Sequence, residues 1–191
     1  MASTAALRDI PFRRADGSTA TLADHAGQVV LVVNVASRCG LTPQYESLER
    51  LFRERRDRGL VVLGFPCNQF REQEPGNDAA IQEFCRTTYG VEFPVLSKIE
   101  VNGPARHPLY AALVSVAPPI AERADGGMRA RLAARGAAPG PDEVMWNFEK
   151  FLLDRDGAVV GRFAPDIAVT DEPLAGAIDA ALAVPVPEHR S

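Results

Sequence analysis

The chain has 191 residues, of which 46% are hydrophobic and 24% are charged, and it carries three cysteines. This length predicts a single domain, residues 1–191, with a core that needs neither disulfides nor metal ions. The 21 basic and 25 acidic residues give a net charge of −4, which argues against nucleic-acid binding. No apolar run approaches the roughly 18 residues of a membrane-spanning helix, so we expect no integral membrane segment.

The N-terminal residues 1–17 contain no apolar segment that resembles a secretory signal. We therefore expect a cytoplasmic protein, in which reactive cysteines are more common than structural disulfides. The odd count of three cysteines also does not fit a disulfide framework.

The first strong element is the aliphatic run at residues 29–33, which is typical of a strand buried on both faces of a sheet. A helix is expected next, with Thr42 as its N-cap, Pro43 in its first turn and Gly59 as its end. Residues 60–65 form a second buried-type strand. This order predicts a βαβ unit in an α/β protein.

Further along the chain, Asn77 and Asp78 are candidate caps of a helix that carries Cys85 on its apolar side. Residues 93–96 predict a short strand, and Pro108 opens another helix, with His107 as a residue of its start. Residues 145–154 and 158–163 predict two strands joined at Asp156-Gly157, a strong hairpin signal. A final helix is expected to start at residues 170–171.

Residues 117–143 are rich in proline and glycine and contain one short helical candidate at residues 128–135. A linker between two domains is conceivable, but only about 50 residues follow, too few for a second core. We interpret the segment as an insertion loop within one α/β domain.

Cys39 is the most informative of the three cysteines. It follows a buried strand and precedes a helix, and ligands of open α/β sheets bind outside the carboxyl ends of the strands. Amide donors at a helix start, and Arg38 beside the cysteine, favour the thiolate. The alternative is a small loop filler. By pattern alone, Cys67 and Cys85 are interpreted as buried core residues, and Trp146 as a core aromatic.

A metal site is not predicted, because the three cysteines are 28 and 18 residues apart and the three histidines are scattered. The missing Cys-x-x-Cys pair also argues against a thioredoxin-type dithiol exchanger. We expect no cofactor. The arginines at residues 50–58 alternate with acids and indicate a solvated helix face or a weak docking patch.

Three long motifs then carry a resemblance. Asn34-Val-Ala-Ser-Arg-Cys39-Gly-Leu-Thr42, Gly64-Phe-Pro-Cys-Asn-Gln-Phe70 with Gln73-Glu-Pro-Gly76, and Trp146-Asn-Phe-Glu-Lys-Phe-Leu152 stand in the same order as in the glutathione peroxidase family. A further stretch, residues 100–110, also matches. The chain resembles the family's cysteine-type members from about residue 7 to residue 183.

The resemblance implies a thioredoxin-like fold, with a central mixed β-sheet flanked by helices, and a thiol peroxidase that reduces hydrogen peroxide and organic or lipid hydroperoxides. It also implies a catalytic tetrad of Cys39, Gln73, Trp146 and Asn147. The chemistry of these residues agrees with these roles, because three neutral N–H donors can stabilise the thiolate and the departing oxygen. Neutral donors also avoid an ion pair, which would lower the nucleophilicity of the sulfur.

The resemblance further implies that Cys85 resolves the Cys39 sulfenic acid as a disulfide, which thioredoxin then reduces. Because Cys85 is expected in the core, its helix must partly unwind. Cys67 is then structural. Glutathione as the reductant stays open, as does a peroxide-sensing relay or a non-catalytic binding module. A monomer or small homo-oligomer is expected.

This sequence departs from the family pattern in two places. Residues 117–143 lengthen a connection that is short in compact members and could shape the mouth of the site or an oligomer contact. Arg71 stands where many relatives have glycine, next to Gln73, and could adjust the preference for peroxide or reductant.

Overall fold

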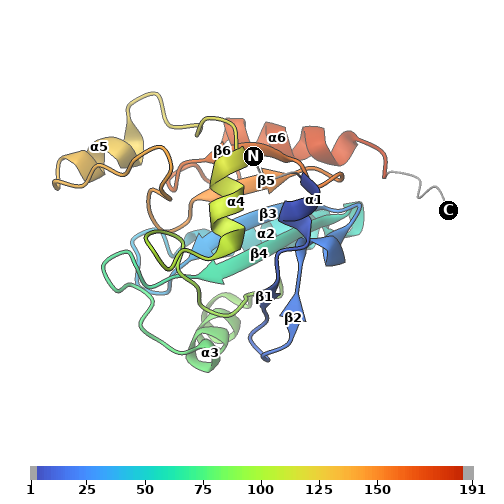
Figure 1. The fold of residues 1–191 in the computed structure, drawn as a ribbon, viewed down its shortest axis with the longest axis horizontal. Coiled ribbons are helices and arrows are strands. Elements are labelled where there is room, and N and C mark those ends of the chain that lie inside the picture. The colour runs from blue at the N-terminus through green and yellow to red at the C-terminus, as the bar shows by residue number, and fades with distance from the viewer. Residues whose placement is uncertain (1–3, 187–191) are drawn as a thin grey trace.

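The computed structural model describes residues 4–186. Its central sheet has the strand order β4-β3-β5-β6 (Figure 1). These strands are β3 (Val29–Val35), β4 (Leu60–Pro66), β5 (Lys150–Leu153) and β6 (Val159–Phe163). β3 pairs parallel with β4 and antiparallel with β5, and β6 pairs antiparallel with β5, so the sheet is mixed as expected.

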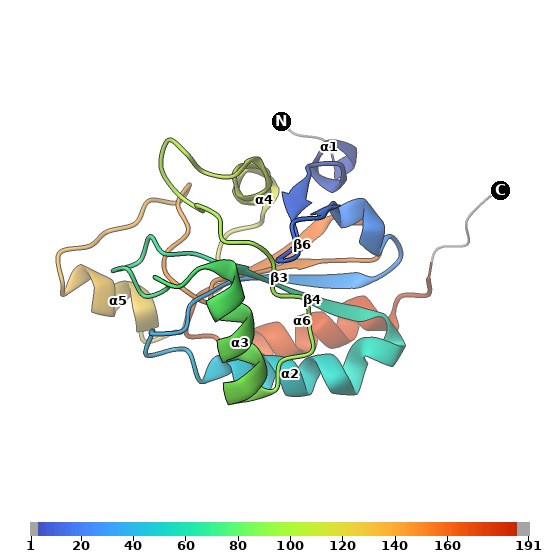
Figure 2. The ribbon, with the colours of Figure 1, turned by 90° about the horizontal axis from the view of Figure 1, so that it is seen from below.

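Helices cover both faces of the sheet, with α2 and α6 on one side and α1 and α4 on the other (Figure 2). Their bounds are α1 Thr4–Arg8, α2 Gln44–Arg55, α3 Asp78–Tyr89, α4 Pro108–Val116, α5 Gly127–Ala133 and α6 Glu172–Ala183. A small hairpin of β1 (Phe12–Arg13) and β2 (Thr19–Ala20) and two 3₁₀ turns, Leu22–His25 and Arg56–Arg58, complete the elements.

Successive residues of β3 point to opposite faces of the sheet and enter two separate cores. Val29, Leu31 and Val33 pack with residues of α2, α3 and α6. Val30 and Val32 pack with residues of α1 and α4 on the other face. An unbroken aliphatic run is therefore what a strand covered on both faces requires, and the predicted βαβ unit is confirmed.

The helix after Cys39 begins later than expected, at Gln44. Thr42 does not cap it with its side chain. Instead the Thr42 hydroxyl donates to the carbonyl oxygen of Ala36 (2.8 Å) and accepts the backbone N–H of Cys39 (2.9 Å). At the other end Gly59 has a φ of 91°, a left-handed conformation that glycine adopts without strain, and so ends the helical segment as predicted.

Two expected strands are wrong in extent. Residues 93–96 form only isolated bridges, Val95 to Gly64 and Leu96 to Arg14, because Pro94 has no N–H to donate to a ladder. The strand expected at 145–154 is confined to Lys150–Leu153. Residues before it turn, since Phe148 has a φ of 70°.

The remaining expected elements are confirmed. Asn77 caps α3 by accepting the N–H of Ala80, and the His107 ring accepts the N–H of Leu109 at the start of α4. β5 and β6 form the predicted hairpin, with Gly157 at a φ of 80°. Within residues 117–143, α5 occupies most of the helical candidate and lies at one end of the molecule, beyond the sheet (Figure 1). None of the helices among residues 4–186 combines the length and apolar character of a bilayer-spanning segment.

Candidate active site

Cys39 lies in the turn between β3 and α2, and its side chain is nearly buried, with 8% of the residue exposed. The backbone N–H of Leu41 donates to its sulfur at 3.3 Å. The hydroxyl of Thr42 holds the Cys39 backbone, as described above. A backbone donor fixed on the sulfur stabilises negative charge there. The turn therefore holds a backbone donor on the Cys39 sulfur.

Gln73 and Trp146 reach the same cavity as Cys39, although they are 34 and 107 residues further along the chain. The backbone N–H of Arg38 donates to the carbonyl oxygen of Gln73 (3.0 Å), which joins the two loops directly. The structure therefore brings together three of the four expected site residues at one surface.

Asn147, the fourth, stands behind Gln73 rather than in the cavity wall. Its amide Nδ2 donates to Gln73 Oε1 at 2.9 Å, which leaves the Gln73 amide N–H groups to face other partners. Asn147 is fully buried. In this geometry it orients Gln73.

Trp146 is half-buried and forms one wall of the cavity. Its ring packs at 5.3 Å from the ring of Phe70, and the Arg71 guanidinium lies 6.0 Å from its centre. Arg71 has a φ of 55°. That conformation is one that glycine adopts more readily than arginine.

The cavity has a volume of about 440 Å³, within the range of sites for small organic ligands. Besides Cys39, Arg71, Gln73 and Trp146, it is lined by six residues to which the sequence analysis assigned no role of their own. These are Gly40, Leu41, Met128, Arg131, Leu132 and Arg135. Four of them come from α5 and its C-terminal end. Two sequence signals pointed to them: the position of residues 117–143, which could shape the mouth of the site, and the spacing of Met128 and Leu132, which puts both on one helix face. Arg38 is exposed and lines a neighbouring hollow with Ser37 and Glu74.

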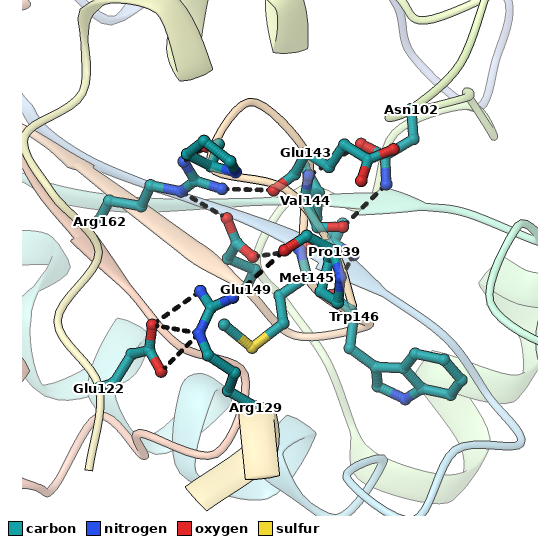
Figure 3. A network of polar contacts seen from close by, with 12 residues as sticks. Asn102, Glu122, Arg129, Pro139, Glu143, Val144, Met145, Trp146, Glu149 and Arg162 are labelled. Atoms are coloured by element: carbon teal, nitrogen blue, oxygen red, sulfur yellow. Dashed lines mark hydrogen bonds and ion pairs between the residues drawn. The ribbon is translucent and has the colours of Figure 1, made fainter. Parts of the chain in front are cut away.

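A buried ion pair holds the loop that carries Trp146 (Figure 3). Arg162 donates to the Glu149 carboxylate at 2.7 Å, and the same carboxylate accepts the N–H of Met145 at 2.6 Å. Arg162 also donates to the carbonyl oxygens of Pro141 and Glu143. Burial raises the pKa of Glu149, while Arg162 opposes that rise. The pair fixes the chain on both sides of Trp146.

Behind Gln73, the carboxylate of Glu74 is buried and accepts the hydroxyl of Ser37 at 2.6 Å. Burial raises the pKa of Glu74. The Asn68 side chain accepts the Glu74 N–H, and Gln69 accepts the N–H groups of residues 101 and 102. Asn68 and Gln69 therefore anchor loops.

The other two cysteines lie away from this cavity. Cys85, on α3, is 2% exposed and lines a separate hollow with Val91, Phe93 and Val95. Burial raises its pKa to about 11. Cys67 is fully buried on the opposite face of the sheet, and burial raises its pKa as well. All three cysteines are free thiols. Within residues 4–186, no group of three or more His, Cys, Asp or Glu side chains is placed to hold a metal ion.

The mixed sheet, with a cysteine in the turn after β3, defines a protein of the thioredoxin-like fold. Among solved structures, the apo form of Trgpx matches with a TM-score of 0.67 and 35% identity over 95% of this chain and 98% of its own. T. cruzi GPX1 matches with a TM-score of 0.67 and 32% identity over 92% and 95%. A Xanthomonas campestris peroxiredoxin Q, 21% identical with a TM-score of 0.53, shares the fold.

The chain belongs to the glutathione peroxidase family, whose family model matches residues 7–114. The thioredoxin/glutathione peroxidase BtuE of Escherichia coli (strain K12) is 52% identical over 94% of this chain and 96% of its own length. The hydroperoxy fatty acid reductase gpx1 of Synechocystis is 48% identical over 82% and 85%. The protein is therefore a peroxidase, which consumes a hydroperoxide and a thiol reductant.

Proposed function

We propose that this peroxidase works through Cys39 as its peroxidatic thiol. The Cys39 thiolate attacks one oxygen of the hydroperoxide, the O–O bond breaks, and the products are a Cys39 sulfenic acid and, after protonation of the leaving oxygen, water or an alcohol. The single observation that carries the assignment is that Cys39, with a backbone donor on its sulfur, shares one cavity with Gln73 and Trp146.

The neutral donors around the sulfur have distinct roles in this proposal. The Gln73 amide and the Trp146 indole N–H stabilise the oxygen as it gains charge, because both side chains line the cavity. Asn147 acts one step behind, since its hydrogen bond fixes which end of the Gln73 amide faces the sulfur. We regard Asn147 as a positioning residue rather than a group that touches the peroxide.

Cys85 completes the cycle as the resolving cysteine. Its thiol condenses with the sulfenic acid to form a Cys39–Cys85 disulfide and water, and a thioredoxin-type dithiol then reduces that disulfide to the two thiols while it is itself oxidised. An internal second thiol favours thioredoxin over glutathione as reductant. Because the cycle needs a supply of reduced thiols, we place the protein in the cytoplasm. Substrates include hydrogen peroxide and organic or lipid hydroperoxides.

The decisive experiment compares two coupled assays, one with thioredoxin and its reductase and one with glutathione and its reductase. We expect turnover with thioredoxin that Cys39→Ser abolishes. Cys85→Ser should retain one turnover with peroxide but lose thioredoxin-driven turnover, and Cys67→Ser serves as the matched control with both retained. Peptide mapping after one equivalent of peroxide should find the Cys39–Cys85 bridge. A Cys39–Cys67 bridge, or full turnover in Cys85→Ser, would show the proposed cycle to be wrong.

A further inference from the structure

The cavity around Cys39 has a charge pattern that cleavage of a small peroxide does not need. Three arginines line it, Arg71, Arg131 and Arg135, and no aspartate or glutamate does. The chain as a whole carries a net charge of −4. The cavity is therefore a local concentration of positive charge on an acidic protein.

Two of these arginines come from α5 and the residues just after it, and α5 is fastened against the cavity. Arg129 donates to both oxygens of Glu122 (2.8 and 3.0 Å) and to the carbonyl oxygen of Pro139, on the side of the helix seen in Figure 3. Met128 and Leu132 pack against Met145, with Leu41 and Trp146 at the edge of that small core. The helix therefore presents its arginines from a fixed wall.

The three arginines differ in what already neutralises them. Arg131 forms an ion pair with Asp166 at 2.9 Å. Arg71 lies over the Trp146 ring, and neither Arg71 nor Arg135 has an acidic partner among residues 4–186. Both side chains are exposed at the mouth of the cavity. Two guanidinium groups are thus free to bind an anion.

The remainder of the lining is apolar, with Leu41, Met128, Leu132 and the Trp146 ring. An apolar wall with a cationic rim fits a molecule that has an apolar chain and a negatively charged end. Such a molecule can place its hydroperoxide group at Cys39 while its charged end stays at the rim.

We infer that Arg71 and Arg135 form a carboxylate-binding rim that makes the enzyme favour an apolar hydroperoxide with an ionised carboxylate over the same hydroperoxide without that charge. The inference rests on the proposed role of Cys39 and extends it to substrate selection. Binding of the substrate carboxylate by these arginines does not change the reaction at the Cys39 sulfur. They raise the local concentration of an anionic substrate and orient it along the wall made by α5.

The test measures single-turnover oxidation of the reduced protein by three substrates: an ionised C18 fatty acid hydroperoxide, its methyl ester, and hydrogen peroxide. The acid and the ester share a chain and differ in charge, so the ratio of their second-order rate constants isolates the rim. We expect the acid to react faster. The ratio should fall about two- to fivefold in Arg135→Gln and again in Arg71→Gln, as for exposed ion pairs, and should fall with added salt.

Arg50→Gln is the matched control, because Arg50 is an exposed arginine on α2 outside the cavity, and it should keep the ratio of the wild type. An acid-to-ester ratio that is near one, or that survives in the double variant, would overturn the inference. A loss of glutathione-dependent reduction in these variants, with the acid-to-ester ratio unchanged, would show that the rim binds the reductant and would also overturn the inference. Failure of all three peroxides to oxidise Cys39 would instead refute the proposed function.

Discussion

In the proposed cycle the second step requires Cys85 to leave the core, and we expect helix α3 to control that release. Cys39 and Cys85 line different hollows, and Cys85 is 2% exposed. A disulfide needs two Cβ atoms about 4 Å apart with a specific geometry. We therefore expect α3 to open locally before the sulfurs join, in a fast equilibrium that precedes bond formation.

Asn77→Ala is the perturbation that tests this opening. The Asn77 side chain accepts the N–H of Ala80 at 2.9 Å, the N-terminal cap of α3. Loss of such a cap costs about 1 kcal/mol of helix stability. Since 1.4 kcal/mol is a factor of ten, the open population and the rate of disulfide formation should rise about fivefold.

Rapid mixing of the reduced protein with one equivalent of peroxide, followed by quenching with an alkylating reagent and mass analysis, gives the first-order rate of disulfide formation. Asn77→Asp keeps a capping oxygen and should stay near the wild-type rate. His107→Ala removes the cap of α4, on the other face of the sheet, and should lower stability without accelerating the disulfide. If Asn77→Ala destabilises the protein but leaves the rate unchanged, α3 does not open before resolution.

Three further changes follow from the buried polar groups. Lys150 is fully buried, and burial lowers its pKa to about 7. The free energy of unfolding of the wild type should therefore rise by about 2 kcal/mol between pH 7 and pH 9 relative to that of Lys150→Met, which urea unfolding at the two pH values measures. The same pH dependence in both proteins would contradict this. Thr42→Val removes two buried hydrogen bonds and should cost about 2 kcal/mol and slow oxidation of Cys39, with rescue by Thr42→Ser. Arg162→Met leaves Glu149 buried without its partner and should cost about 3 to 5 kcal/mol with a shift in Trp146 fluorescence, and a loss below about 1 kcal/mol would refute the role of the pair.

The sign of the Lys150 effect follows from linkage. In the unfolded chain the lysine stays protonated up to about pH 10.4, while the folded state releases its proton near pH 7. The unfolded state therefore binds more protons between these values, and stability rises with pH. Below about pH 7 both states hold the proton, so the full cost of burying a charged lysine is present there.

The parts of the fold that sequence predicted are those that local patterns determine. The aliphatic runs of β3 and β4, the Asn77 cap and the Asp156-Gly157 hairpin all act within a few residues. The expected strand at residues 145–149 failed because its geometry depends on a distant partner. Arg162, on β6, draws the Glu149 carboxylate into the turn that replaces the strand.

The candidate site likewise has a part that the sequence predicts and a part that it does not. Cys39 could be singled out from its place between a strand and a helix, and the family resemblance added Gln73 and Trp146, which meet it in the cavity. The sequence allowed residues 117–143 to shape the mouth of the site, but it could not predict which of them do so, because the position of Met128 and Arg135 depends on packing with Met145. The three-dimensional arrangement shows that α5 borders the cavity of Cys39.

The alternation of side chains along β3 has a consequence for the redox cycle. Cys39 and Cys85 belong to the core on the α2 and α6 face, whereas Cys67 belongs to the core on the α1 and α4 face. In the proposed cycle, the sheet separates a layer that must loosen at each turnover, so that Cys85 can reach Cys39, from a layer that keeps its packing. On that proposal the sheet keeps Cys67 apart from the thiol exchange, and the α1 and α4 layer supports the opposite layer while it opens.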